Sequence, residues 1–205
     1  MDLVKVLPMA FVMIAGPQII SAVFLATTER WRQNCAAYVL GAALSISIVV
    51  VAAYYLIDAA QSEGKSNDTF YYIVLGLLLF LAFNAYRTRE TAEPPKWMGR
   101  LQTATPKFSF QLGFLLLGVF PTDIVTSVAV GTFLSAGNDP VWHYLPFLGL
   151  TLLFLAAPAL TVLAMGQRGQ ELLPKVRDWM NANSWIINEI VIGIFILLTI
   201  NNIVG

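Results

Sequence analysis

Two short segments combine a proline, a nearby glycine and several polar side chains inside otherwise apolar stretches. They read IAGPQIIS at residues 14–21 and GVFPTDIVTS at residues 118–127. A proline inside a helix removes one hydrogen bond and clashes with the preceding turn, while Gly16 and Gly118 add backbone freedom nearby. In a bilayer such freed backbone is tolerated only inside protein or beside water. We therefore expect two interrupted helices that meet at a binding site.

The candidate site takes in both prolines, the polar residues that follow them and two later asparagines. These residues are Pro17, Gln18, Ser21, Pro121, Thr122, Asp123, Thr126, Asn84 and Asn201. Along a straight helix counted from Phe108, Asp123 lies ~22 Å into a ~30 Å hydrocarbon layer. An ionised carboxylate at such depth costs roughly 3 kcal/mol or more. Asp123 must therefore be hydrated, hydrogen-bonded or protonated.

Packing is the competing explanation for these residues. Proline is frequent in membrane helices, so a single one would favour a kink without a function. Asn84 and Asn201 lie late in their apolar stretches, where interhelical hydrogen bonding explains them as well as ligand binding does. Two prolines in matching positions, each followed by polar residues, favour a functional site.

Six long apolar stretches carry the candidate residues. They cover residues 3–27, 33–57, 70–87, 108–135, 142–166 and 184–204. Each reaches or nearly reaches the ~20 residues that a helix needs to cross a bilayer, and runs of this length in lipid must be helical. The composition, with 58% apolar and 12% charged residues, agrees with an all-α integral membrane protein.

The same composition excludes several classes of function. The net charge is zero, so we expect no attraction to nucleic acid. The chain has a single cysteine, Cys35, and a single histidine, His143, which exclude a disulfide framework and a Cys/His metal cage. It contains neither a Walker motif nor an intramembrane-protease motif. We therefore expect no enzyme activity, no cofactor and no metal.

Basic residues are distributed unequally between the two sides of the expected helix bundle. Only Lys5 and Lys65 lie on the side of the termini, and the remaining ten of the twelve Lys and Arg residues lie on the other side. The positive-inside rule then places the basic linkers in the cytoplasm and both termini outside. We expect a multi-pass protein of the cytoplasmic membrane of a prokaryote.

The linker at residues 88–107 divides the chain into two halves, 1–87 and 108–205, with three expected spans each. Because three spans reverse the side of entry, a repeat between the halves must be inverted. Residues 73–84 and 190–201 align without gaps and place Asn84 on Asn201, and the first and fourth spans align Pro17 on Pro121.

We therefore predict two inverted three-helix repeats in which the first and fourth helices are broken. Between the fifth and sixth spans, residues 170–181 have apolar side chains on one helical face and charges on the opposite face. This spacing predicts a short helix in the cytoplasmic interface.

Several segments resemble a known transporter family. GPQIISAVFLATTERWRQN, at residues 16–34, resembles the glycine-proline motif and basic loop of the lysine-exporter (LysE) superfamily. Residues 95–124 and 166–197 resemble the GAP family of that superfamily, whose founding members are sulfolipid- and peptidoglycolipid-addressing proteins. The resemblance implies a six-helix transporter fold and export of an amphipathic glycolipid or a related envelope component. Where that family carries an asparagine-proline-lysine-like turn, this chain has Phe120-Pro121-Thr122-Asp123.

These observations favour a secondary transporter that exports or flips an amphipathic, lipid-like solute. The expected partners are membrane lipid, the amphipathic or small solute, a coupling proton or sodium ion, and a second copy of the chain in a homo-oligomer. The alternatives are a non-transporting membrane scaffold that assists another export machine and an exporter of a small amino-acid-like solute.

The distribution of basic residues yields a prediction about topology. In a Cys35→Ala background, a single cysteine introduced at Gly205 should react with a membrane-impermeant maleimide added outside intact cells, because an even number of spans returns the chain to the outer side. A cysteine at Arg168 should react only after the cells are opened. Labelling of position 205 only in opened cells would overturn the orientation.

Overall fold

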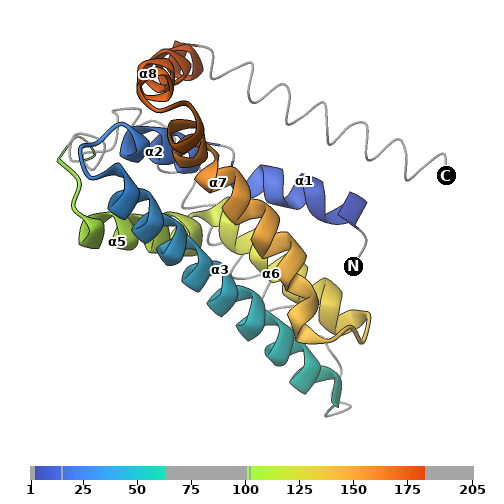
Figure 1. The fold of residues 1–205 in the computed structure, drawn as a ribbon. Coiled ribbons are helices and arrows are strands. Elements are labelled where there is room, and N and C mark those ends of the chain that lie inside the picture. Colours follow the sequence, from blue (N-terminus) through green and yellow to red (C-terminus); the bar gives the residue numbers. More distant parts are fainter. Residues whose placement is uncertain (1–2, 15, 63–100, 102, 183–205) are drawn as a thin grey trace.

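The computed structural model describes residues 3–14, 16–62, 101 and 103–182, and every element within them is a helix (Figure 1). The helices are α1 Leu3–Ile14, α2 Pro17–Ala26, α3 Trp31–Ser62, α5 Pro106–Val119, α6 Pro121–Ala136, α7 Leu145–Met165 and α8 Gln167–Ala182, with a short 3-10 helix η2 Val141–Tyr144 before α7. The chain is thus an all-helical protein over its described length.

Helices of membrane-spanning length and polarity occur where the sequence predicts the second, fourth and fifth spans. Trp31–Asp58 and Val141–Met165 are each long and apolar enough to cross a bilayer. Pro106–Val119 and Thr122–Ala136 qualify as a third span if the bent pair is taken together. The predicted spans at 70–87 and 184–204 lie outside the described residues, so the count of six and the inverted repeat stay predictions.

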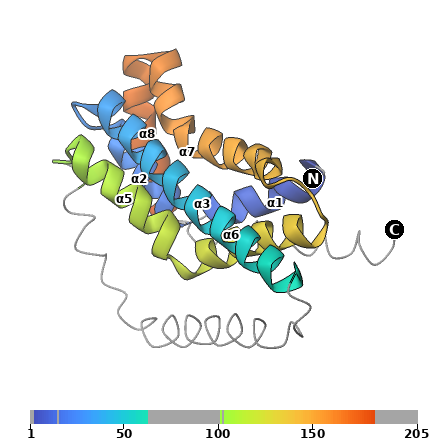
Figure 2. The ribbon, with the colours of Figure 1, turned by 90° about the horizontal axis from the view of Figure 1, so that it is seen from below.

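Helix α3 is the central element of the bundle and packs against α5, α6 and α7 (Figure 2). Near its start, the Asn34 side chain donates a 3.0 Å hydrogen bond to the carbonyl oxygen of Ala104, just before α5. Near its far end, the Tyr54 hydroxyl donates a 3.1 Å bond to the carbonyl of Asp139, just after α6. Helix α3 therefore runs parallel to the α5–α6 pair. Successive spans cross a membrane in alternating directions, so a second and a fourth span are expected to be parallel.

Glycines allow α3 and α5 to approach closely. A Cβ atom on Gly113 would collide with the carbonyl of Tyr38, and one on Gly41 would collide with the carbonyl of Phe110. In membranes, where lipid removes the hydrophobic drive between helices, such small residues let backbones pack tightly. Gly118 belongs to this contact too, since its Cβ would meet the Ser45 side chain. Its role is packing, and not the backbone freedom expected from the sequence.

Helix α8 contains the amphipathic segment predicted at residues 170–181 and packs against α2 and α7. Leu173 is buried on the side that faces the bundle, while Leu172 and Val176 are exposed. Gly169 allows the close approach to α7, because a Cβ there would meet the backbone at Thr161. The helical state of the segment is confirmed, and its place in a membrane interface stays a prediction.

The glycine contact generates a test of the fold. Gly113→Ala should lower the stability of the protein by about 1–3 kcal/mol, because the new methyl group must push α3 away from α5. Gly149→Ala in α7 is the matched control, since a Cβ there meets nothing within 4 Å. Thermal unfolding of both purified variants in detergent measures the difference. Equal midpoints for the two variants would contradict the close α3–α5 packing.

Candidate functional site

The first helix is interrupted where the sequence places its glycine and proline. Helix α1 ends at Ile14, and α2 begins with Pro17 at its first position. Gly16 between them has φ 116° and ψ −142°, a conformation that residues with a Cβ rarely adopt. An added Cβ would also lie 3.2 Å from the side-chain oxygen Oε1 of Gln18. The break therefore depends on glycine, and the proline starts the next helix without losing a backbone bond.

The fourth helix is interrupted in the same way. Helix α5 ends at Val119, Phe120 is extended, and α6 begins with Pro121. The two parts are bent by 66°. The carbonyl of Phe120 accepts hydrogen bonds from the backbone N–H groups of Asp123 and Ile124, at 3.1 and 3.0 Å, which closes the first turn of α6. Helices α5 and α6 therefore do not form the straight helix on which the depth of Asp123 was counted.

A direct hydrogen bond joins the two interrupted helices. The Gln18 side-chain amide donates from Nε2 to Oδ2 of Asp123 at 2.7 Å, across 105 residues of sequence. Both residues have 0% exposed surface. The Thr122 hydroxyl lies 3.4 Å from the other carboxylate oxygen, Oδ1. The two polar segments therefore meet in direct contact.

The helix break itself helps to stabilise the carboxylate. Asp123 is the third residue of α6, in the first turn, at the end of the helix to which the aligned peptide dipoles give a partial positive charge. An acid in this position is stabilised by roughly 0.3–1 kcal/mol, and by up to ~2 kcal/mol in partly buried geometries. A hydrogen bond to a charged group adds about 1.5–3 kcal/mol. Together these effects are comparable to the penalty for placing a carboxylate in the membrane.

The remaining predicted site residues have different surroundings. Ser21 is buried and donates to the carbonyl of Pro17, while Thr126 donates to the carbonyl of Thr122 at 2.8 Å. Both hydroxyls thus bond to the preceding turn of their own helix. Asn84 and Asn201 lie outside the described residues.

Tyr38 belongs to the site and was not predicted from the sequence. Its hydroxyl donates a 2.9 Å hydrogen bond to the backbone carbonyl of Gln18, and its side chain is buried. This bond anchors the first turn of α2 on α3. A signal was present, since Tyr38 is a tyrosine well inside an apolar stretch, away from the tyrosines and tryptophans at the stretch ends.

Two buried side-chain oxygens, one in Gln18 and one a helical turn from Asp123, have no hydrogen-bond partner within the part of the chain that the structure describes. One is Oε1 of Gln18, and the other is the hydroxyl of Ser127, one helical turn beyond Asp123. A buried acceptor without a partner costs about 1–3 kcal/mol. A carboxylate with an unpaired amide oxygen nearby has the chemistry to bind a cation or to accept hydrogen bonds from a polar solute.

These features define a helical membrane protein in which two interrupted helices meet at a buried carboxylate. The profile of one family, described as Sap, sulfolipid-1-addressing protein, matches residues 6–204. The chain belongs to this family, which confirms the resemblance to the GAP-type proteins, while the wider LysE superfamily stays a prediction. The description of the family points to a role in lipid addressing or export. Comparisons with curated proteins and with solved structures gave no match.

The Gln18–Asp123 bond predicts non-additive stabilities. Gln18→Leu and Asp123→Leu should each destabilise the protein, because each leaves a buried polar partner unpaired, and the double variant should recover part of the loss. We expect a coupling free energy of about 1–2 kcal/mol from chemical unfolding in detergent. Thr161→Val combined with Asp123→Leu is the control and should be additive, since the Thr161 hydroxyl donates to the carbonyl of Ala157 in its own helix. Additivity in the first cycle would mean that the bond contributes nothing.

Proposed function

We propose that this protein is a small secondary transporter that exports or flips an amphipathic, lipid-like solute across the cytoplasmic membrane of a bacterium. The observation that carries the proposal is the 2.7 Å bond between Gln18 and Asp123, which connects two helices at their breaks. Interrupted helices in corresponding positions of two halves are characteristic of transporter binding sites.

The geometry supports a cycle in which this bond opens and closes. With the bond made, Gln18 and Asp123 are shielded from solvent. Separation of α2 from α6 would expose the carboxylate to water or to a solute from one side. Because Gly16 and Phe120 both leave the helical conformation, the half-helices would rotate about these two residues without unfolding.

Asp123 is the proposed coupling group. A carboxylate in a dry membrane site is costly when ionised and unpaired, so its proton or a bound sodium ion exchanges only when water reaches it. Alternating exposure of Asp123 to the two sides would let an ion gradient drive export. The adjacent acceptors, Oε1 of Gln18 and the Ser127 hydroxyl, would supply further oxygens for a sodium ion.

The family supports a lipid-like substrate, because its description names sulfolipid addressing. A rival proposal is a non-transporting scaffold that assists another export machine. The contact between Gln18 and Asp123 is direct and fully buried. If this contact never opens, no solute can reach the carboxylate, and the scaffold is then the better explanation. Purified protein in liposomes without any other component separates the two proposals.

Asp123→Asn should abolish gradient-driven movement of a fluorescent, nitrobenzoxadiazole-labelled anionic lipid in proteoliposomes, while the protein stays folded. The amide keeps the shape of the side chain but cannot exchange a proton or attract a cation. The measurement is dithionite quenching of the lipid in each leaflet under an imposed pH or sodium gradient. Asp139→Asn is the control, since Asp139 lies beyond the other end of α6 beside His143.

Gradient-driven movement at the wild-type rate in Asp123→Asn would refute the coupling role. Wild-type protein that moves neither anionic nor neutral glycolipid probes under any gradient would favour the scaffold.

A further inference from the structure

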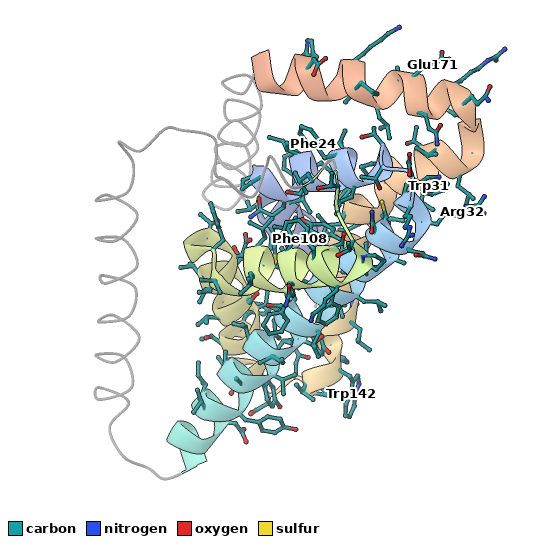
Figure 3. The ribbon with its side chains drawn as sticks, turned by 90° about the vertical axis from the view of Figure 1, so that its left-hand side faces the viewer. Phe24, Trp31, Arg32, Phe108, Trp142 and Glu171 are labelled. Atoms are coloured by element: carbon teal, nitrogen blue, oxygen red, sulfur yellow. The ribbon has the colours of Figure 1, made fainter. Side chains whose placement is uncertain are left out.

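The turn between α2 and α3 forms a cavity that is open to the surface. Figure 3 shows Trp31 and Arg32 of this turn at the end of the bundle that also carries α8. Residues Glu29, Arg30, Trp31, Arg32 and Gln33 line it, and its volume is about 350 Å³. The Thr28 hydroxyl caps α2 by donating to the carbonyl of Leu25 at 2.7 Å, and the Asn34 side chain bonds to that hydroxyl at 2.9 Å. Asn34 also donates to the carbonyl of Ala104, just before α5. Hydrogen bonds thus connect the turn to α2, to α3 and to the segment before α5.

The cavity has the charge and the donors to bind an anion. Arg30 and Arg32 are exposed, and neither forms an ion pair within the described part of the chain. The guanidinium of Arg32 lies over the Trp31 ring, 5.3 Å from its centre, which fixes the orientation of the planar group. With Glu29 present, the cavity keeps one net positive charge. Guanidinium groups bind the oxygens of phosphate or sulfate through paired hydrogen bonds.

An apolar row begins at this cavity and continues along α3. Starting from Arg32, every fourth residue of the helix is exposed, namely Ala36, Leu40, Leu44 and Ile48. Leu40 is the most exposed of the three large side chains, at 63%. Such a row is inclined to the helix axis, and its apolar part covers ~18 Å of rise from Ala36 to Ile48. That length is comparable to the ~15 Å that the acyl chains of one leaflet occupy.

The position of the cavity agrees with the headgroup layer of a membrane. Trp31 lies at the boundary between a charged turn and a membrane-length helix, where tryptophan is typical. Figure 3 shows Trp31 and Arg32 at the end of the molecule at which Glu171 of α8 lies. Helix α8 adds the exposed basic residues Arg168 and Lys175 at the same end. An ion free in solution would need no apolar row, so the occupant that fits both features is a lipid.

We propose that the cavity at the α2–α3 turn binds the phosphate or sulfate headgroup of an anionic membrane lipid, with an acyl chain along Leu40, Leu44 and Ile48. This site lies apart from Gln18 and Asp123, and its occupation does not depend on transport. A binding measurement therefore tests it separately from the proposed function.

Native mass spectrometry of the full chain, released from detergent with added phosphatidylglycerol, measures the binding. Arg30→Gln/Arg32→Gln should reduce the affinity for phosphatidylglycerol about tenfold or more. Each charge-assisted pair between a guanidinium and the headgroup contributes about one factor of ten to the affinity. Arg32→Lys should retain part of the affinity, because it keeps the charge but loses the planar fork. Arg168→Gln/Lys175→Gln is the matched control, with the same loss of charge at the same end, and should leave affinity within about threefold.

Three outcomes would overturn the proposal. An equal loss in the α8 control would mean that general surface charge attracts the lipid. Equal binding of phosphatidylcholine and phosphatidylglycerol to the wild-type protein would show that the headgroup charge is not recognised. Complete displacement of phosphatidylglycerol by millimolar inorganic phosphate, together with unchanged affinity in Leu40→Ser/Leu44→Ser, would identify an ion site without a lipid chain. A selective loss of phosphatidylglycerol in the Leu40→Ser/Leu44→Ser variant would support the proposal.

Discussion

A carboxylate inside an apolar helix bundle must find polar partners, and this constraint accounts for the arrangement around Asp123. Water supplies the partners in a soluble protein, but a hydrocarbon layer does not. Here the partners are the amide of Gln18, at 2.7 Å, and the N-terminal turn of α6. Both depend on helix breaks, since an unbroken α5–α6 helix would offer no positively charged end at this position. The two prolines and the buried acid are therefore parts of a single structural solution.

Helix α3 holds both parts of this site in place. Gly41 and Gly113 bring α3 and α5 into backbone contact, which fixes the helix that leads into the break at Phe120. One helical turn away, Tyr38 binds the backbone carbonyl of Gln18 and fixes the first turn of α2. A change in the packing of α3 would thus move Gln18 and Asp123 relative to each other. The same helix extends to the α2–α3 turn, so the proposed lipid site and the carboxylate site share one rigid element.

The sequence predicts those features that depend on local chemistry. Proline is favoured in the first turn of a helix, so the breaks before Pro17 and Pro121 were predictable, as was the amphipathic α8. Proline alone does not decide it, since Pro158 and Pro174 lie inside α7 and α8. The direct contact of Gln18 with Asp123 depends on how α3 and α5 place α2 near the start of α6, and spacing alone indicated only that both residues belong to one site. The hydrogen bond of Tyr38 to Gln18 and the packing of Gly118 against Ser45 depend on neighbours that lie far away in sequence. The pattern of a single helix contains no information about such neighbours.

The central claim is that the breaks in the two helices form a ligand site that is closed by the Gln18–Asp123 bond. A cryo-electron microscopy map of the protein in nanodiscs that contain an anionic glycolipid tests it most directly. We expect interrupted helices before Pro17 and Pro121, with lipid or ion density against Asp123 and the side-chain oxygen of Gln18 in at least one conformation. Straight helices, or lipid density confined to the outer faces with Gln18 and Asp123 in contact in every conformation, would contradict it.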